Sequence, residues 1–394
     1  MEPNASDATA RELMLDFAAA TGLTAAAKEP RRYLWTDAFA VCNFLGLYRR
    51  TGDGTWRDLA ESLVDQVHRI LGRHRDDDLR VGWISGLAEE EGELHPTRWG
   101  LRIGKPLSER RPGDPPNERL EWDRDGQYYH YLTKWMHALC RMGRATGDRR
   151  YVAWALELAQ AAHSRFVWVH PGDGRKRIYW KMSIDLRRPL VLAMGQHDPL
   201  DGLVTLCDLK AAAGEAASSV WPGVVEAIAD LARICREEAE WVTEDPLGIG
   251  GLLFDARRIA ELEATGHFVD AALLEGVLDA ALAGLRSFAA DNPLKYRARQ
   301  RLAFRELGLA IGLKGVGALK RCIGGNPQVF GDGGAVTQQV EALAEYVPFA
   351  GLIERFWLDG RNREGESWTE HRDINMVMLA TSIAPEEFLR VDDR

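Results

Sequence analysis

Three segments of this sequence combine aromatic rings with carboxylates, histidines and cationic side chains, and they are the parts best suited to chemistry. They lie at 82–130, 179–202 and 366–373. Aromatic faces stack against the C–H side of a pyranose ring, and charged or amide groups bind its hydroxyls, so the mixture is typical of sugar recognition. A long loop also needs aromatic residues to pack and charges to stay hydrated. If the three segments converge on one rim, we favour a binding site over that simpler interpretation.

Carboxylates are plentiful in the first two of these segments. Glycoside hydrolysis requires one protonated carboxyl as acid and a second, ionised carboxylate that activates water or attacks the sugar. Burial among Trp and Tyr would raise one pKa, and a nearby Lys or Arg would lower the other. Among Asp123, Asp125, Asp185, Asp198 and Asp201, we predict that Asp125 and Asp198 form the catalytic pair. The alternative is that these aspartates only cap helices, Asp198 and Asp201 doing so for a helix that begins near Leu203.

A helix expected from Tyr128 carries a polar face. His130, Lys134 and His137 are spaced at i, i+4 and i+7, so they share one side of that helix. On an inner helix of a closed ring this side would face the central cavity, whereas on an ordinary amphipathic helix it would face water. The buried character of the other expected inner helices favours the cavity.

The other polar and aromatic residues of the three segments are predicted to bind substrate. Trp99, Trp180 and Trp368 would stack on sugar rings, and the basic residues favour an acidic sugar. The predicted substrate-binding residues are Trp99, Arg102, Gln127, His130, Lys134, Trp180, Lys181, Asp185, Arg188, His197, Trp368 and His371.

Motifs of several other chemistries are missing from the sequence. It contains no Walker loop, no GxGxxG opening a helix after a strand, no GxSxG elbow and no HExxH. His197, Asp198 and Asp201 are capable metal ligands, but their spacing matches no metal-binding motif. We therefore expect neither a metal nor a cofactor.

Repeated helix–turn–helix units are the elements that would position these residues. Thr51-Gly52-Asp53 and Thr146-Gly147-Asp148 each separate an apolar helix from a one-faced helix, and 264–267 repeats the pattern in weaker form. Further helices are expected at 8–20, 225–242, 301–313, 336–356 and 373–381. These make about eleven or twelve helices, or roughly six hairpins, in which buried inner helices alternate with outer ones.

Two very long connections distinguish this chain from a solenoid with constant repeats. The segment 73–124 has no convincing periodicity and 167–200 has little. Each follows an outer helix and precedes an inner one, so both would emerge at one end of the fold, and structureless loops of this size are usually functional. We predict an all-α fold, an (α/α)6 toroid with long loops at one end, in which 1–394 form a single domain.

The composition of the 394 residues is that of a globular protein, with 46% hydrophobic and 28% charged residues. A net charge of −9 disfavours nucleic acid as a partner. No run approaches 18 apolar residues, and the N-terminus lacks the apolar core of a signal peptide, so we expect no membrane span. Five cysteines without a CxxC pair fit small buried side chains in a reducing compartment. These features predict a cytoplasmic protein with a small-molecule carbohydrate as partner, and they are compatible with a homo-oligomer.

The hairpins, the Thr-Gly-Asp turns and the loops rich in Trp, His and Asp resemble the six-hairpin, (α/α)6-barrel glycosidase-like superfamily. The run from Asp125 to Trp135 is similar to the start of an inner helix in unsaturated-uronide hydrolases, and this resemblance implies an acid/base role for Asp125. The superfold also includes sugar epimerases of the acylglucosamine type, which use histidines. That resemblance would move the roles to His130, His197 and His371.

We therefore predict a glycoside hydrolase-like enzyme that acts on an oligosaccharide or uronide through a carboxylate pair. The alternatives are a sugar epimerase or isomerase that uses histidines, and a non-catalytic carbohydrate-binding protein. Two facing carboxylates would favour hydrolysis, two facing histidines would favour proton transfer, and neither arrangement would favour binding alone.

Overall fold

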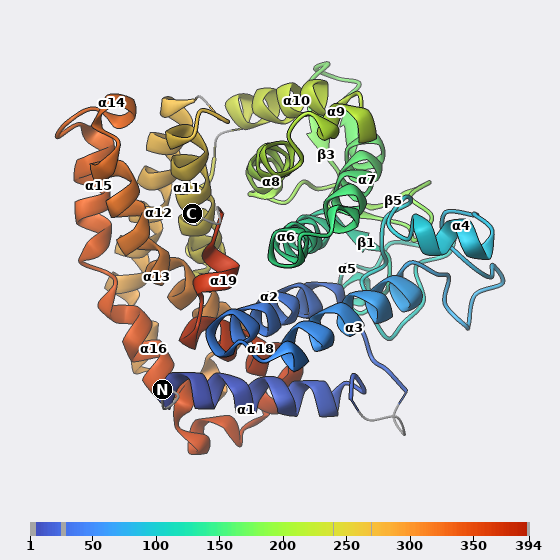
Figure 1. Ribbon diagram of the computed structural model, residues 1–394, viewed down its shortest axis with the longest axis horizontal. Helices are drawn as coiled ribbons and strands as arrows, with labels where there is room; N and C mark the ends of the chain where they lie inside the picture. The colour runs from blue at the N-terminus through green and yellow to red at the C-terminus, as the bar shows by residue number, and fades with distance from the viewer. Residues whose placement is uncertain (1–4, 25–28, 239, 269, 392–394) are drawn as a thin grey trace. The chain divides into compact units, whose positions relative to one another are not determined.

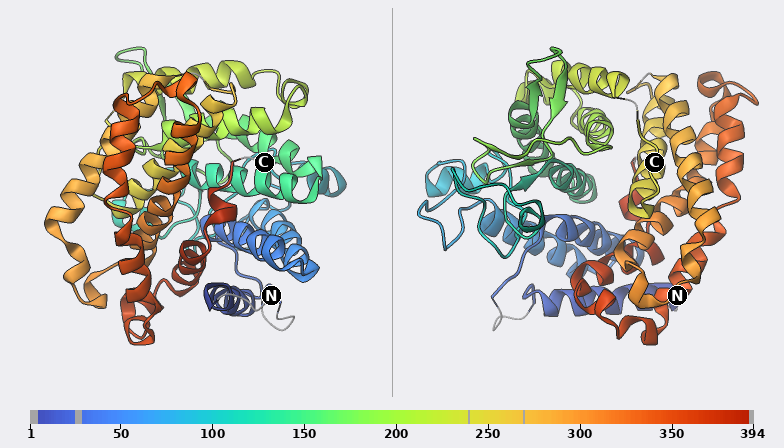
Figure 2. Two further views of the ribbon diagram at one scale, coloured as in Figure 1. Left: turned by 60° about the vertical axis from the view of Figure 1, so that its left-hand side comes forward. Right: turned by 180° about the vertical axis from the view of Figure 1, so that it is seen from behind.

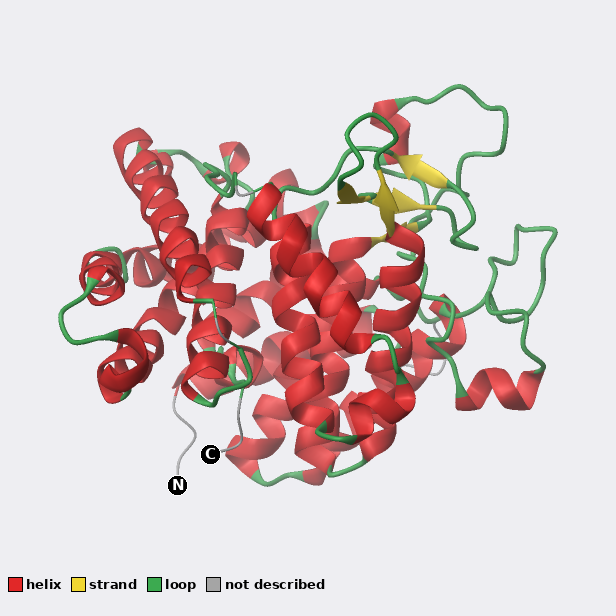
Figure 3. Cartoon of the chain, turned by 90° about the horizontal axis from the view of Figure 1, so that it is seen from above, coloured by secondary structure: helices red, strands yellow, loops and turns green. Residues whose placement is uncertain are grey.

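The computed structural model describes residues 5–24, 29–238, 240–268 and 270–391. The chain divides into two compact units: an N-terminal unit, Ala18–Glu238, and a C-terminal unit that joins Met1–Phe17 to Ala239–Arg394. Helix α1 (Ala5–Ala20) runs across the boundary. Helices dominate both units, and the few strands are short (Figure 3). Within the described ranges, no helix combines the length and the apolar character needed to cross a membrane.

The N-terminal unit is a set of helical hairpins. Helices α2, α6 and α8 contact one another in sequence, and α3, α7 and α10 each pack on one of them (Figure 1). Helix α2 is buried along most of its length, whereas α3 buries only one face, as the sequence predicted for inner and outer helices. The helices are α2 (Leu34–Thr51), α3 (Gly54–Leu71), α6 (Tyr129–Thr146), α7 (Arg149–Phe166), α8 (Asp198–Ala213), α9 (Ala216–Val220) and α10 (Val224–Glu237).

The two Thr-Gly-Asp turns have the same construction, which confirms their prediction as helix boundaries. In the first turn, the Thr51 hydroxyl donates to Leu47 O and accepts from the Asp53 amide. Gly52 takes the left-handed conformation at φ 69°, and the Asp53 carboxylate accepts from the Thr55 amide to cap α3. The second turn repeats each step, with its glycine at φ 75°. Glycine reaches this region without steric cost, so the turn reverses the chain in three residues.

The two long connections contain short helices and strands, and strands join one connection to the next. Strand β4 pairs with β1 and β5, and Gln127 lies opposite Met182 in the β1–β4 register. Strands β2 and β3 form a separate ribbon. Because these strands have only two or three residues, they are too short to show the alternation of apolar and polar residues from which a strand is predicted. The elements are α4 (Glu89–Leu94), α5 (Glu118–Glu121), β1 (Gln127–Tyr128), β2 (Val167–Val169), β3 (Lys176–Ile178), β4 (Lys181–Met182) and β5 (Pro189–Val191).

The C-terminal unit is a helical bundle around α13, and its helices from α11 onward are drawn yellow to red in Figure 2. Helices α11, α15, α16 and α18 all contact α13. Its helices are α11 (Pro246–Ala264), α12 (Ala271–Asp291), α13 (Ala303–Gly325), α14 (Pro327–Phe330), α15 (Ala335–Ala344), α16 (Pro348–Leu358), α17 (Glu366–Thr369), α18 (Arg372–Ile383) and α19 (Glu386–Leu389). Three 3-10 turns accompany them: η1 (Pro293–Lys295), η2 (Ala298–Gln300) and η3 (Gly360–Arg363).

One helix expected in this unit is divided in the structure. The helix expected over 336–356 is broken into α15 and α16. Pro348 is the first residue of α16, and proline lacks the N–H that would continue the helix from α15. The apolar pattern runs on through the break, so periodicity alone did not reveal it.

Glycines let α11 and α13 approach at backbone distance. A Cβ atom on Gly250 would lie 2.2 Å from Gly308 O, and one on Gly312 would lie 2.5 Å from Gly250 O. Side chains at these positions would force the two helices apart. The close contact between α11 and α13 therefore depends on glycine at positions 250 and 312.

We expect Gly250→Ala to lower the free energy of unfolding by about 2 kcal/mol, because the added methyl group overpacks this contact. Gly251→Ala is the matched control: no atom lies within 4 Å of its added Cβ, and alanine favours the helix by up to about 1 kcal/mol. Urea denaturation followed by circular dichroism measures both. Equal stabilities for the two variants would contradict the packing argument.

Candidate active site

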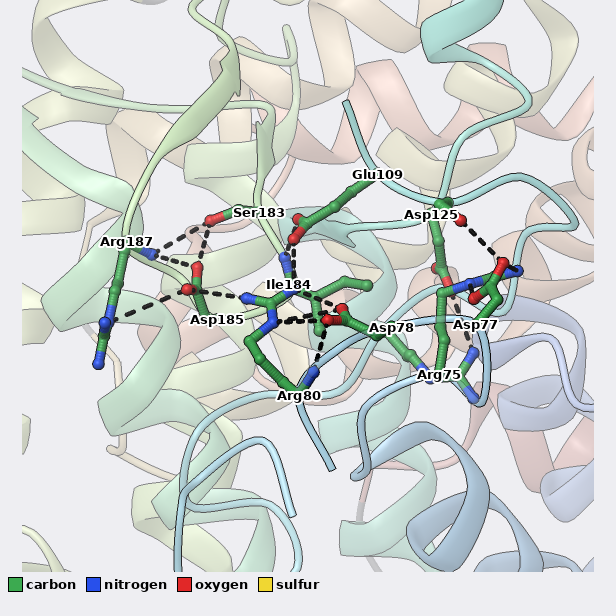
Figure 4. A network of polar contacts seen from close by, with 12 residues as sticks. Arg75, Asp77, Asp78, Arg80, Glu109, Asp125, Ser183, Ile184, Asp185 and Arg187 are labelled. Atoms are coloured by element: carbon green, nitrogen blue, oxygen red, sulfur yellow. Dashed lines mark hydrogen bonds and ion pairs between the residues drawn. The ribbon is translucent and has the colours of Figure 1, made fainter. Parts of the chain in front are cut away.

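The two long loops meet in a network of charged side chains. Arg80 contacts Asp185 at 3.0 Å and Glu109 at 2.6 Å, and the second oxygen of Glu109 accepts from the Ile184 amide at 2.7 Å (Figure 4). Asp78 supplies a further carboxylate to Arg80. The predicted convergence of the first two segments is thus confirmed within the N-terminal unit.

Asp125 lies at the base of this loop assembly and is fully buried. Its Oδ1 atom accepts from the amides of Gly104 and Gly126, and its Oδ2 atom accepts from Arg102 at 3.0 Å and from Arg75 at 3.3 Å. Four donors surround the carboxylate, and helix α6 is capped at Tyr128 without a side-chain bond. Asp125 therefore fixes the loop to the start of α6, and the helix-cap alternative does not describe it.

Several predicted substrate-binding residues make their polar contacts with the loops themselves. The Gln127 side chain accepts from the Leu101 amide and donates to Ile184 O at 2.7 Å. The Lys181 ammonium donates to Glu121 O and Arg124 O, and burial lowers its pKa to about 8. These contacts join the two loops to each other.

Trp99 and Arg188, two more of the predicted substrate-binding residues, also bond from one loop to the other. Trp99 donates from Nε1 to Asp185 O at 2.9 Å, and the Arg165 guanidinium lies 4.5 Å from the centre of its ring. Arg188 donates to Arg110 O, which joins the two loops a second time. A substrate would have to compete with these protein contacts.

A second polar cluster lies where the first turn of α8 faces α6. His130 Nδ1 is 3.7 Å from Asp198 Oδ1, and Lys134 Nζ is 2.8 Å from Asp201 Oδ1. Thr133 donates its hydroxyl to the second oxygen of Asp201. We call these five residues the His130–Asp198 cluster. Helix α8 begins at Asp198, so both aspartates belong to its first turn rather than preceding a helix at Leu203.

Glycines make room for this cluster. A Cβ atom on Gly195 would lie 2.5 Å from the Asp198 carboxyl, and one on Gly202 would lie 2.3 Å from the Tyr129 hydroxyl. The Asp198 carboxyl and the Tyr129 hydroxyl thus pack directly against the backbone at these two glycines. The carboxyl of Asp198 is therefore enclosed, with only 7% of its side chain exposed.

Burial drives the pKa values of Asp198 and His130 in opposite directions. Loss of hydration raises the pKa of Asp198 to about 8, and the charge of Asp201 adds to this effect while Lys134 opposes it. Burial also lowers the pKa of His130 to about 4, with Lys134 adding to the effect. At neutral pH the cluster thus presents a protonated carboxyl beside an uncharged imidazole.

Two atoms of this cluster lack hydrogen-bond partners among the residues that the structure describes. They are His130 Nδ1 and Asp198 Oδ2, and both are buried. Buried polar atoms are normally paired, and an exception requires an explanation. The His130 side chain is 30% exposed, so a ligand can approach the imidazole from one side.

Aromatic rings line the His130 side of the cluster. The His130 ring is nearly parallel to Trp180 at 13° and 6.2 Å, and Tyr128 stacks on it at 5.4 Å. Tyr131 meets the same ring edge-on, and its hydroxyl lies 2.5 Å from that of Tyr33. These rings form an aromatic wall next to the unpaired imidazole nitrogen.

Trp368 and His371 lie in the C-terminal unit. Trp368 is buried and stacks on Trp357 at 5.8 Å, and the His371 ring packs edge-on against Phe304. Their predicted role in substrate binding stays a prediction. His197 precedes α8 as its N-cap residue, directly before Asp198.

Sequence reasoning did not single out Thr133, Tyr33 or Tyr131. Thr133 lies three residues after His130, about one turn along α6, and directly before Lys134, and this spacing would have placed it near His130. Tyr33 belongs to a segment almost one hundred residues earlier, so no local pattern could have paired it with Tyr131. Nowhere in the described ranges do three or more His, Cys, Asp or Glu side chains gather in a way that could hold a metal ion.

The helical hairpins, the small sheets and the loop assembly belong to an (α/α)6-barrel fold, the fold of the solved structures that match the chain. No family model matches the chain, and no curated protein matches its sequence. Solved structures do match it along nearly its whole length, at 10–12% identity. At such low identity the likeness concerns the fold.

Three of these structures come from glycoside hydrolase family 76. An α-mannanase of Bacteroides thetaiotaomicron is 11% identical, covers 98% of this chain and 97% of its own, and gives a TM-score of 0.56. An inactive α-1,6-mannanase of Salegentibacter sp. HEL1_6, with two aspartates replaced and α-1,6-mannotetrose bound, is 12% identical over 98% and 100% of the chains, with a TM-score of 0.53. A third, from a bovine Bacteroides thetaiotaomicron strain, is 10% identical over 98% and 78%, with a TM-score of 0.54.

We expect Asp125→Asn to lower the free energy of unfolding by about 3 kcal/mol, because Arg75 and Arg102 lose the charge that they share. Asp123→Asn, at an exposed position two residues earlier, should change it by less than about 0.5 kcal/mol. Urea denaturation at neutral pH measures both. Unchanged stability together with lost activity would instead support the catalytic role predicted for Asp125.

Asp198 should make stability depend on pH. Its pKa is raised in the folded state, so the folded protein holds an extra proton between about pH 4 and pH 8, and stability falls as the pH rises through that window. Asparagine is neutral throughout. As the pH rises from about 4 to about 8, the stability of Asp198→Asn should therefore increase relative to that of the unmodified protein, on the order of 1 kcal/mol per pH unit. Melting curves across the window measure this, and parallel curves would contradict the raised pKa.

Proposed function

We propose that this chain is a carbohydrate-active enzyme that hydrolyses a glycosidic bond of an oligosaccharide, with Asp198 as the proton donor. The observation that carries the proposal is the pair of aspartates on the first turn of α8. Asp198 is buried with a raised pKa, whereas Asp201 is paired with the Lys134 ammonium at 2.8 Å. Two carboxyl groups in different environments are what acid–base catalysis of glycoside hydrolysis requires.

In the proposed reaction, Asp198 gives its proton to the glycosidic oxygen as the bond to the departing sugar breaks. Asp201 is the carboxylate next to it, oriented by Lys134 and Thr133, and it would activate water or attack the sugar. The sequence analysis paired Asp198 with Asp125, and that pairing stays a prediction. We favour Asp201 because Asp125 already accepts four hydrogen bonds.

The aromatic wall supplies the binding surface in this proposal. Trp180 is half-buried, and the exposed Trp122 packs against it edge-on at 4.8 Å. An indole face of this kind stacks on the apolar face of a pyranose, and the uncharged His130 can bind one of its hydroxyls. The likeness to three family 76 glycoside hydrolases in fold supports hydrolysis over other sugar chemistry.

A second candidate function is epimerisation or isomerisation of a sugar. It is favoured by one observation: the unprotonated His130 lies 3.7 Å from the protonated Asp198. In that reaction the imidazole would take a proton from a carbon next to a carbonyl, and the carboxyl would donate to the carbonyl oxygen. The two reactions leave different products.

We expect the unmodified protein to release new reducing ends from α-1,6-mannotetraose or from another oligosaccharide of a neutral and uronate panel. Asp198→Asn should lower that rate by at least about 100-fold, because the leaving sugar loses its proton donor. Activity should also fall as the pH rises through about 8, where Asp198 loses its proton. Reducing-end assays over a pH series measure both.

Asp123→Asn is the control for the loss of a carboxylate. A reaction run in deuterium oxide distinguishes hydrolysis from isomerisation. New reducing ends without deuterium on carbon would support hydrolysis. Deuterium on sugar carbon without new reducing ends would support the isomerase instead. Full activity in Asp198→Asn would remove Asp198 from either reaction.

A further inference from the structure

A cavity of about 400 Å³ lies in the N-terminal unit, apart from the His130–Asp198 cluster. Its walls come from α3, from α7 and from the loop segment 83–96. Two indoles, Trp83 and Trp154, and the carboxylate of Glu157 are part of the lining. None of the lining residues belongs to the cluster or to its aromatic wall, so a ligand in this cavity would have a separate site.

The cavity walls are joined by hydrogen bonds between the loop and α7. Trp154 donates from Nε1 to Leu94 O at 2.8 Å, and the Thr97 hydroxyl donates to Trp154 O at 2.8 Å. The imidazole of His95 bonds the Glu157 carboxylate at 2.6 Å. These contacts hold the loop against the helix before any ligand arrives, which reduces the entropy cost of binding.

Buried His68 supports the same wall from behind. Its Nε2 atom accepts from the Trp135 indole at 3.1 Å, and its ring meets Trp154 edge-on at 5.0 Å. Burial lowers the pKa of His68 to about 3, so it remains an uncharged acceptor. The position of Trp154 is therefore set from the α6 side as well as from the loop.

Two buried atoms of lining residues have no hydrogen-bond partner within the described part of the chain. Trp83 Nε1 is a donor on a side chain that is 3% exposed, and Glu157 Oε2 is an acceptor. Both atoms are covered by protein, so a ligand hydroxyl would accept from the first or donate to the second only after the side chain shifts toward the cavity.

The charges of the lining favour a neutral ligand. Asp65, Glu93 and Glu157 oppose Arg69 and Arg150, and Arg150 is already paired with Asp148 at 2.7 Å. An anion would meet three carboxylates. One face of each indole already carries a guanidinium, with Arg73 4.5 Å from the centre of Trp83 and Arg150 5.8 Å from that of Trp154, which disfavours a second cation there.

We propose that this cavity is a second saccharide-binding site that takes one neutral pyranose residue. A pyranose has both properties that the lining requires, because it carries hydroxyls around its rim and an apolar C–H face. The inference rests on the cavity's own residues and does not depend on Asp198 being catalytic. If the proposed hydrolysis is correct, the site would keep the enzyme attached to a sugar chain while the catalytic site releases its product.

The test uses the Asp198→Asn protein, labelled with 5-fluorotryptophan, and fluorine NMR. Loss of a peak in Trp154→Phe assigns the Trp154 resonance. The probes are the methyl glycosides of mannose, glucose and galactose, with methyl glucuronide as the anionic probe and choline as the cationic probe. We expect the Trp154 resonance to shift in a saturable way with at least one neutral glycoside, and with neither charged probe.

Glu157→Gln should weaken that binding by about tenfold, because the ligand hydroxyl loses its charged acceptor. Glu90→Gln, an exposed glutamate on α4 outside the lining, is the matched control and should bind normally. If Glu157→Gln fails to fold, Ala153→Leu fills the cavity instead and should abolish the shift. In the otherwise unmodified protein, Glu157→Gln should leave the rate of hydrolysis of a short substrate unchanged.

No shift with any neutral glycoside would overturn the proposal, as would preferred binding of either charged probe. Binding that survives both Glu157→Gln and Ala153→Leu would place the ligand elsewhere and would also overturn it. Failure of the catalytic proposal appears separately, as full activity of Asp198→Asn. The two proposals can therefore fail independently.

Discussion

The bond between Arg80 and its three carboxylates is the interaction on which the site depends. Arg80 comes from the first long loop, and Asp185 comes from the second. Glu109 also accepts from the Ile184 amide just after β4, β4 pairs with β1, and β1 leads directly into α6. The start of α6, which carries His130, is thus connected to a charge network that contains no residue of the His130–Asp198 cluster.

Burial, more than any charged neighbour, keeps the Asp198 carboxyl protonated at neutral pH by raising its pKa. The opposite shifts of Asp198 and His130 have one main cause, the loss of hydration at the start of α8. An ion pair between them would have required both groups to be charged in a poorly hydrated place, which is costly. In this protein Asp198 and His130 are both uncharged at neutral pH, and the Lys134 ammonium pairs with Asp201. Such a site can transfer a proton without first separating charge.

The hairpins could be predicted from the sequence because their causes are local. Apolar periodicity gave the inner and outer helices, and Thr-Gly-Asp gave their boundaries through bonds that span at most four residues. The loop assembly could not be predicted, because Arg75 reaches Asp125 across 50 positions and Arg80 reaches Asp185 across 105. Asp125 was conspicuous as an aspartate before a helix, but only its four donors distinguish an anchor from a free carboxylate. Asp198 was predicted as a catalytic carboxyl, and that role stays a prediction; its close contact with Gly195 could not be predicted, because no sequence pattern marks it.

The division of the chain between the two units bears on the order of its synthesis. The C-terminal unit includes Met1–Phe17, yet its remaining residues follow only after Glu238. A ribosome therefore completes the whole N-terminal unit while α1 still waits for the helices of its own unit. During this interval the apolar side of α1, which includes Leu13, Met14 and Phe17, stays uncovered by that unit. Helix α1 is therefore packed late although it precedes the N-terminal unit in the chain, and in the interval its apolar side is open to aggregation and to chaperone capture.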